Sequence, residues 1–209
     1  MQAGALVTIE GLDGAGKTTL ARALAQELQR RGRNVLVLRE PGGVPVSERI
    51  RELVQDPQAE VAPRTEALLY AAARAQLVSE LLSPALRRGE LVLLDRFLDS
   101  SLAYQGAGRG LGVQQVREIN LFATGGLTPD RTLLLKITPQ AGRARQDGRG
   151  QEPDRLERED GAFFAVVAAA YDELAAQEPQ RIRTIDAELE PPAVLAQALA
   201  ALADLIPPG

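Results

Sequence analysis

The chain of 209 residues contains no histidine and no cysteine. The missing histidine excludes every mechanism that uses an imidazole as a base or metal ligand, including Ser-His-Asp hydrolysis. The missing cysteine excludes disulfides, a thiol nucleophile and zinc–thiolate sites. Aromatic residues make up only 3%, the formal net charge is −4, and the arginines are scattered along the chain. These features argue against a nucleic-acid partner.

Long apolar runs are missing as well. No run approaches the eighteen or so residues that a membrane-spanning helix needs. The first ten residues lack the basic segment and apolar stretch of a signal peptide. We therefore expect a cytoplasmic protein with no membrane partner. The length and the 45% apolar content predict a single domain spanning residues 1–209.

Lysine is scarce. Among the 24 basic residues only Lys17 and Lys136 are lysine, so the composition strongly prefers arginine. Lys17 nevertheless stands inside a glycine-rich segment. Because lysine offers a phosphate a compact point charge rather than a planar fork, we infer a chemical requirement for lysine at this position.

Short apolar runs alternate with segments of helical periodicity. Strands are predicted at 5–10, 34–38, 91–94, 132–137 and 182–185. Helices are predicted at 18–31, 47–54, 63–82, 113–124 and 159–176, and further helices begin at 138–139 and 191–192. This alternation predicts an α/β fold with a five-stranded parallel sheet and helices on both faces. Because the glycine-rich segment that contains Lys17 lies between the first predicted strand and the first predicted helix, the fold is expected to be of the P-loop NTPase type.

Two segments depart from this regular pattern. The stretch 144–158 is charged, contains two glycines and has almost no apolar content, so a mobile loop or short lid is predicted at about 143–158. The long helix at 63–82 has apolar side chains on more than one face. Either it packs on two sides within the chain, or one face contacts a second subunit and the protein is a homodimer.

The segment from Gly11 to Thr18 fits the phosphate-binding pattern G-x-x-x-x-G-K-[ST] at every fixed position, between a predicted strand and a predicted helix. Backbone N–H groups of such a loop converge on phosphates, and the helix N-terminus adds positive potential. Lys17 is expected to reach the β- and γ-phosphates, and the Thr18 hydroxyl to bind magnesium. The predicted ATP-binding residues of this loop are Gly11, Leu12, Asp13, Gly14, Ala15, Gly16, Lys17 and Thr18.

Two charged residues follow the third predicted strand. Asp95 ends that strand and matches the second acidic element of P-loop enzymes, which holds magnesium directly or through water. Arg96 is costly to bury without an anion. That anion is either a bound phosphate or a structural carboxylate.

Six segments together resemble bacterial thymidylate kinases over nearly the whole chain. They are EGLDGAGKTT at 10–19, REPGG at 39–43, LLYAAAR at 68–74, Asp95-Arg96, SSLAYQG at 100–106 and DRLE at 154–157. The glycine motif alone is generic, whereas the combination is specific to the family. The resemblance implies transfer of a phosphoryl group from magnesium-bound ATP to thymidine monophosphate (dTMP) in dTTP biosynthesis, by a homodimer.

The resemblance also implies how the base and sugar of dTMP are bound. Tyr70 stands where the family usually has a phenylalanine that stacks on thymine, and a tyrosine ring stacks as well. Arg74 would hydrogen-bond the base edge, and Tyr104 would lie against the sugar and disfavour a 2′-hydroxyl. The remaining base-pocket residues implied are Ser100, Ser101 and Gln105.

Around the acceptor phosphate the resemblance implies Glu40, Arg51 and Arg96, with Asp13 near the acceptor sugar and phosphate. The catalytic residues implied are Lys17, Asp13, Arg96 and a lid arginine. The acceptor is a phosphate oxygen that is already ionised at neutral pH, so no strong base is needed. Catalysis then depends mainly on positioning and charge neutralisation, which is consistent with the missing histidine.

The lid arginine is not fixed by the sequence. Some family members carry an arginine directly after the acidic residue of the phosphate loop, where this chain has Gly14. The other type supplies the arginine from the lid, and the lid here contains Arg143, Arg145, Arg149, Arg155 and Arg158. We favour Arg149 as the catalytic residue, with Arg155 second, and expect Arg143 to bind ATP.

Two other functions compete with this prediction. One is a kinase of another nucleoside monophosphate, such as uridylate or a purine nucleotide, against which the SSLAYQG segment argues by resemblance. The other is a nucleotide-dependent switch that binds partners. A GTPase switch would show Asn-Lys-x-Asp for guanine recognition, and that motif is absent from the sequence.

Overall fold

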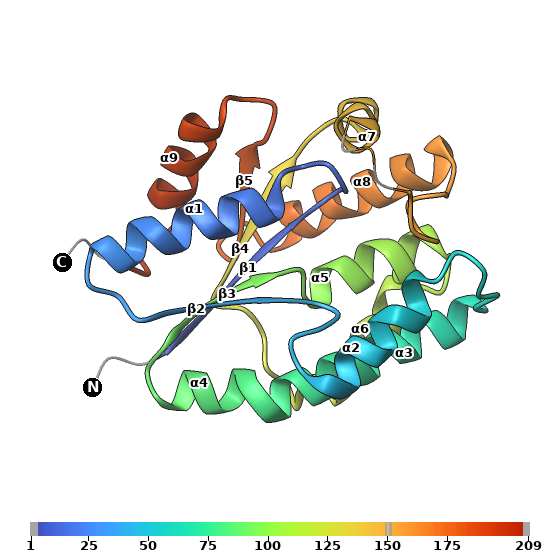
Figure 1. Ribbon diagram of the computed structural model, residues 1–209, viewed down its shortest axis with the longest axis horizontal. Coiled ribbons are helices and arrows are strands. Elements are labelled where there is room, and N and C mark those ends of the chain that lie inside the picture. The colour runs from blue at the N-terminus through green and yellow to red at the C-terminus, as the bar shows by residue number, and fades with distance from the viewer. Residues whose placement is uncertain (1–3, 149, 151, 207–209) are drawn as a thin grey trace.

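A computed structural model describes residues 4–148, 150 and 152–206. Figure 1 shows a central sheet with helices on both of its faces. The five strands are parallel and lie in the order β2-β3-β1-β4-β5. Their bounds are β1 Ala5–Gly11, β2 Val35–Arg39, β3 Leu91–Asp95, β4 Arg131–Lys136 and β5 Ile182–Asp186. The predicted α/β fold with a five-stranded parallel sheet is confirmed.

One face of the sheet is covered by α1 (Lys17–Arg30) and α9 (Pro191–Ala201), which pack against each other. The periodicity of α1 explains its placement. Leu20, Leu24 and Leu28 recur every four residues, all three are buried, and the helix packs on β2 and β3. The apolar strands meet this layer in a single buried core.

The opposite face carries most of the remaining helices (Figure 1). Those that contact the sheet directly are α4 (Ser83–Arg87), α5 (Leu98–Ser101) and α8 (Gly161–Gln177). Outside them lie α2 (Pro45–Gln55), α3 (Pro63–Leu77) and α6 (Val113–Thr124), with α3 packed against both α2 and α6. None of the helices in the described part of the chain is both long and apolar enough to span a membrane.

Three predicted elements need correction. The helix predicted at 63–82 does not stop there: after α3 a π-helical turn, η1 (Val78–Leu82), leads directly into α4. Pro84 in the first turn of α4 has no N–H to donate, which fits the irregular turn before it. The segment 98–108, for which the sequence predicts no helix, forms α5 followed by a π-helical stretch, η2 (Leu102–Gly108).

The third correction concerns the lid. Residues 144–147 are helical, because α7 runs from Pro139 to Asp147. The predicted cap is confirmed: the Thr138 hydroxyl accepts a hydrogen bond from the Ala141 N–H at 3.3 Å. Between α7 and α8, the described part of the segment has no helix or strand, so the irregular lid is shorter than predicted.

Parallel pairing aligns the ends of the strands that carry the motifs. Ile9 and Arg39 are both in register with Asp95, so the phosphate loop, the REPGG loop and Asp95-Arg96 emerge at the same edge of the sheet. Ligands of open α/β sheets bind at the carboxyl ends of the strands. The fold therefore brings together segments that are up to 85 residues apart in the sequence.

Candidate active site

The phosphate loop has the backbone shape that its glycines predict. Gly14 and Gly16 have φ values of 83° and 91°, in the left-handed region that side chains disfavour. Lys17 is buried, and its ammonium group donates to the carbonyl oxygens of Gly11 at 3.1 Å and Leu12 at 2.8 Å. Burial and the nearby Arg96 lower the pKa of Lys17, whereas the Asp13 carboxylate, 3.6 Å away, opposes this shift. These contacts hold the Lys17 ammonium group against the first two residues of the phosphate loop.

Gly14 has a second reason to lack a side chain. A Cβ at this position would lie 2.2 Å from the carbonyl oxygen of Gly142 in α7, and a Cβ on Gly142 would lie 2.7 Å from the Asp13 carbonyl oxygen. The phosphate loop and the helix that leads into the lid therefore touch backbone to backbone. With this backbone, the loop has no room for an arginine side chain at position 14.

Thr18 and Asp95 lie together beside the loop. The Thr18 hydroxyl donates to Asp95 Oδ2 at 2.6 Å, as the first turn of α1 meets the end of β3. The described residues contain no cluster of three or more acidic side chains that could enclose a metal. Two oxygen ligands from protein suit magnesium at a nucleotide-binding site, where phosphates and waters supply the rest. These residues therefore fit a magnesium ion that is bound together with a nucleotide.

The guanidinium group of Arg96 connects several parts of the site through hydrogen bonds. Its guanidinium donates to Asp13 Oδ1 at 2.5 Å, to the Gly11 carbonyl oxygen at 3.1 Å and to Ser100 Oγ at 3.0 Å. It also lies over the ring of Tyr104, 5.1 Å from the centroid. Arg96 has a φ of 69°, the only positive value among the described residues other than glycine. Such strain is tolerated where the surroundings fix the side chain, and it is common at functional sites.

Asp13 and Arg96 stabilise each other as ions. Burial by itself would raise the pKa of Asp13, but the charges of Arg96 and Lys17 outweigh it and hold that pKa well below its usual range. Burial would lower the pKa of Arg96, and Asp13 raises it instead. The Tyr104 hydroxyl donates to Asp13 Oδ2 at 3.1 Å and completes this cluster.

A cavity of about 790 Å³ opens beside the phosphate loop. It combines residues predicted for the donor with residues predicted for the acceptor. Those of the predicted site residues that line it are Asp13, Gly14, Gly16, Lys17, Thr18, Glu40, Arg51, Tyr70, Asp95, Arg96, Ser100, Tyr104 and Gln105. Arg51 donates to the Pro41 carbonyl oxygen at 3.0 Å, and burial and the charge of Arg39 lower its pKa.

Arg74 and Ser101 lie behind the wall of this cavity. The buried guanidinium of Arg74 donates to Glu40 Oε2 at 2.7 Å, to Ser101 Oγ at 3.0 Å and to the Phe97 carbonyl oxygen at 2.9 Å, and it also donates to Asn120. Most of its N–H groups are therefore occupied by protein. The structure places Arg74 as a support of the wall, and its predicted contact with the base stays a prediction.

One carboxylate oxygen of Glu40 makes no hydrogen bond to the described residues. Its Oε1 is buried and has no hydrogen-bond partner among the described residues, although Glu40 lines the cavity. Burial raises the pKa of Glu40 to about 7, against the opposing charge of Arg74. A buried oxygen without a partner is costly, so a ligand donor is expected at this point.

Two buried carboxylates beside the site, Glu10 and Glu66, were not predicted from the sequence. Glu10 is fully buried under the loop, where it accepts hydrogen bonds from Phe97 N–H at 2.7 Å and from Tyr171 Oη at 3.0 Å. Burial and the Asp99 charge raise the pKa of Glu10 to about 7. The available signal was an acidic residue inside an otherwise apolar strand. Glu66, also fully buried, gave no signal because it is one of several charged residues in its helix.

The described lid arginines are all engaged by protein. Arg143 donates weakly to the carbonyl oxygens of Glu157 and Glu159, at 3.4 and 3.5 Å. The others pair as follows: Arg145 with the Ala187 carbonyl oxygen, Arg155 with Glu66 and the Val54 carbonyl oxygen, and Arg158 with the Pro153 carbonyl oxygen. Arg149, predicted as the catalytic arginine, lies outside the described residues.

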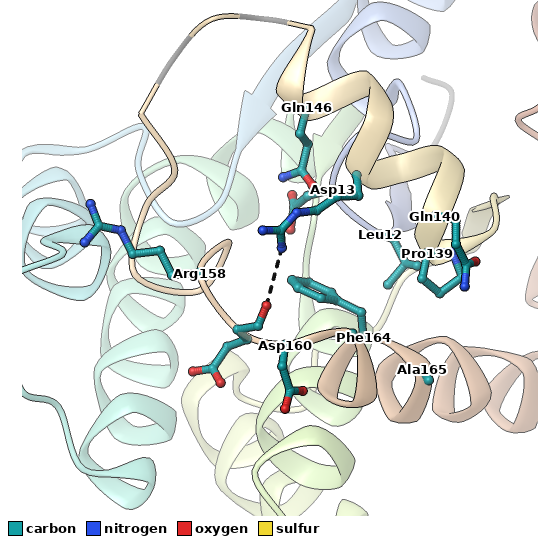
Figure 2. Close-up of a pocket in the computed structure, with 12 residues that line it drawn as sticks. Leu12, Asp13, Pro139, Gln140, Gln146, Arg158, Asp160, Phe164 and Ala165 are labelled. Atoms are coloured by element: carbon teal, nitrogen blue, oxygen red, sulfur yellow. Dashed lines mark hydrogen bonds between the residues drawn. The ribbon is translucent and has the colours of Figure 1, made fainter.

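Arg143 lines a second cavity, of about 420 Å³, between α7, the lid and the first turn of α8. Figure 2 shows Leu12, Pro139 and Phe164 on its apolar side. Asp13 borders both cavities, so the phosphate loop separates them. The predicted contact of Arg143 with ATP stays a prediction.

Comparisons with known proteins agree with this geometry. The family model described as thymidylate kinase matches residues 9–198. The chain is 52% identical over 187 residues to the thymidylate kinase of Deinococcus radiodurans, covering 90% of each protein. It is 48% identical over 196 residues to the thymidylate kinase of Lactobacillus delbrueckii subsp. bulgaricus, covering 92% of each.

A solved structure gives the same result. The thymidylate kinase of Ehrlichia chaffeensis superposes with a TM-score of 0.77 at 26% identity, covering 96% of this chain and 99% of that one. A family match over most of the chain, relatives near half identity and a shared fold all point the same way. The chain belongs to the thymidylate kinase family, the kinases that phosphorylate dTMP to dTDP.

Proposed function

We propose that the chain transfers the γ-phosphoryl group of ATP to dTMP inside the 790 Å³ cavity, within one kinase domain spanning residues 1–209. The observation that carries this proposal is the continuity of the cavity. Lys17 of the phosphate loop and Tyr70 of α3 line the same space, so donor and acceptor can meet without leaving it. Holding two reactants in contact is the largest part of what such a kinase must do.

The donor side is formed by the phosphate loop. Its backbone N–H groups and the N-terminus of α1 would bind the phosphates of ATP, with Lys17 over the β- and γ-phosphates. Thr18 and Asp95 would hold magnesium, which neutralises phosphate charge when it is bound. The 2.6 Å contact between these two residues supports their sharing one ion.

The acceptor side is formed by α3, the REPGG loop and η2. The thymine ring would stack on Tyr70, which is half-buried and lines the cavity. The Tyr104 ring would close the sugar site, with its hydroxyl already fixed on Asp13. Arg51 and Arg96 would bind the acceptor phosphate, and the free Glu40 oxygen would accept a hydrogen bond from dTMP.

The catalytic lid arginine is proposed to be Arg149. Two observations support it: Gly14 has no room for a side chain, and Arg143, Arg145, Arg155 and Arg158 already have protein partners. An arginine that neutralises charge at the transferring phosphoryl group matters mostly in the transition state. Closure of the lid would also exclude water and suppress ATP hydrolysis.

A panel of acceptors tests the function. We expect dTMP to be preferred clearly over its ribose analogue, because Tyr104 would crowd a 2′-hydroxyl. We also expect it to be preferred over dCMP, because a pocket of fixed polar groups rejects a wrong pattern by leaving its own groups unpaired. Deoxyuridine monophosphate lacks only one methyl group and should be poorer by roughly ten- to a few-hundredfold at most. The measurement is kcat/KM at saturating ATP and magnesium. Equal values for dTMP and dCMP would contradict the acceptor assignment and leave the phosphate loop unaffected.

We also propose that the protein is a homodimer. Leu68 on α3 is 56% exposed and Phe122 on α6 is 92% exposed, and the two helices pack side by side on the outside of the molecule. Large exposed apolar side chains on adjacent helices support a contact with a second copy. A monomer mass by light scattering at micromolar concentration would contradict this.

The predicted cytoplasmic location and the lack of a nucleic-acid partner stay predictions.

A further inference from the structure

Glu66 is a fully buried carboxylate that collects donors from three parts of the fold. Its Oε1 accepts from Gln105 Nε2 at 2.9 Å and from Arg109 Nε at 3.3 Å. Its Oε2 accepts from Arg109 Nη2 at 3.2 Å and from Arg155 Nη2 at 2.6 Å. The residue lies one turn before Tyr70 in α3, and its partners are Gln105 in η2, Arg109 directly after η2, and Arg155 in the lid. None of these contacts is used by the phosphoryl transfer described above.

The carboxylate fixes which way the Gln105 amide points. A carboxylate paired with two guanidinium groups accepts hydrogen bonds and donates none, so Gln105 must turn its NH₂ group toward it. The amide oxygen is then directed away from Glu66. Gln105 lines the acceptor cavity, and no described residue donates to its Oε1. The free oxygen of a nearly buried glutamine is therefore available to a ligand.

We propose that Glu66 is a positioning residue for pyrimidine selection: it locks the Gln105 amide so that a hydrogen-bond acceptor faces the base. The inference rests on the proposed function, in which the base occupies this cavity. Thymine carries a donor, N3–H, at the point where cytosine carries an unprotonated nitrogen. If the pocket presents only a hydrogen-bond acceptor at this point, it pairs with the N3–H of thymine and repels the unprotonated nitrogen of cytosine. Discrimination against cytosine thus depends on a residue behind the pocket.

The substitution Glu66→Gln makes a specific prediction. Two arginine Nη2 groups meet the Oε2 position, one of them at 2.6 Å, whereas only the longer 3.3 Å contact of Arg109 Nε meets the Oε1 position. The new amide oxygen would therefore lie at the Oε2 position and the new NH₂ group at the Oε1 position, with loss of the Arg109 Nε contact. That group donates, so Gln105 must rotate its amide and present its own NH₂ to the base. The cavity edge then matches cytosine and mismatches thymine. Since an unpaired or mismatched buried hydrogen bond costs about 1–3 kcal/mol, the dTMP-to-dCMP preference should fall roughly 5- to 150-fold.

The experiment compares dissociation constants of dTMP and dCMP by calorimetry, without ATP, and kcat/KM for both acceptors. Arg155→Met is the matched control, because it removes a partner of the same carboxylate without touching Gln105. Its preference for dTMP should equal that of the wild type, whatever it does to turnover. Glu66→Asp keeps the negative charge but shortens the side chain by one methylene, which lengthens the contact with Gln105, and it should reduce the preference about two- to tenfold.

The outcomes separate the inference from the proposed function. A reduced preference in both Glu66 variants, with Arg155→Met unchanged, supports the inference. An unchanged preference in a folded Glu66→Asp or Glu66→Gln protein overturns it, even if turnover falls, because a purely structural role lowers both acceptors alike. Equal binding of dTMP and dCMP by the wild type overturns the acceptor assignment itself, and the inference with it.

Discussion

The contact between Gly14 and Gly142 makes a quantitative prediction about the phosphate loop. In Gly14→Ala the new Cβ meets three backbone atoms of Gly142, at 2.2, 2.8 and 2.9 Å, where ordinary contacts begin near 3.4 Å. None of these atoms belongs to a side chain that can rotate away, so α7 must shift by about 1 Å. We expect an overpacking cost of about 1–3 kcal/mol, and a further cost of about 1–2 kcal/mol because φ is +83°.

Gly16→Ala is the matched control. Gly16 has a φ of +91°, but a Cβ there has no atom within 4 Å, so only the conformational cost applies. Urea unfolding without nucleotide, followed by circular dichroism, should show that Gly14→Ala loses about 1–3 kcal/mol more than Gly16→Ala. Equal losses would refute the close packing of the loop against α7. They would also remove the structural reason for the missing loop arginine.

Four further predictions follow from the site. Lys17→Ala should remove most turnover while the circular dichroism spectrum stays unchanged, because the lysine faces developing phosphate charge; near-normal turnover would contradict the phosphoryl-transfer assignment. Arg149→Ala should lower kcat far more than it weakens dTMP binding, and an effect on binding alone would exclude it as the lid catalyst. Asp13 contributes stability above its unfolded pKa of 3.8, because Arg96 and Lys17 overcome the effect of burial and lower its folded pKa. That contribution begins to fall as the pH drops below about 4 and is lost fully only below the lower folded pKa, so the stability difference between wild type and Asp13→Asn should be smaller at pH 3 than at pH 7. Phe122→Asp should shift the light-scattering mass from dimer to monomer, and a monomeric wild type would rule out the interface.

Much of the fold follows from local patterns in the sequence. Leu20, Leu24 and Leu28 predict α1 because a helix that covers a sheet must present apolar residues every three or four positions. The five short apolar runs predict the strands of a parallel sheet, because a strand that is covered by helices on both faces needs a nearly continuous apolar sequence. The π-helical turns could not be predicted this way. Their geometry depends on how the long helix and η2 fit their neighbours, which no local period records.

The residues of the candidate site likewise fall into those that sequence spacing predicts and those that depend on tertiary packing. Lys17 and Thr18 are identified by spacing alone, because the chemistry of phosphate binding requires those residue types in that order. The position of Arg74 behind the cavity wall could not be foreseen, since it depends on Glu40, Ser101 and Asn120 meeting in space. Glu66 was missed because a charged residue in a helix looks like a solvated one until tertiary packing buries it.

The most direct test of the central claim follows the phosphoryl group itself. ATP labelled at the γ-phosphate is incubated with the wild-type protein, magnesium and dTMP, and the products are separated by chromatography. The site predicts that the label appears in the β-phosphate of dTDP, one per ADP formed, with little inorganic phosphate and little ATP consumption when dTMP is omitted. Label that appears only as inorganic phosphate, or equally in the products of other monophosphates, would contradict the account.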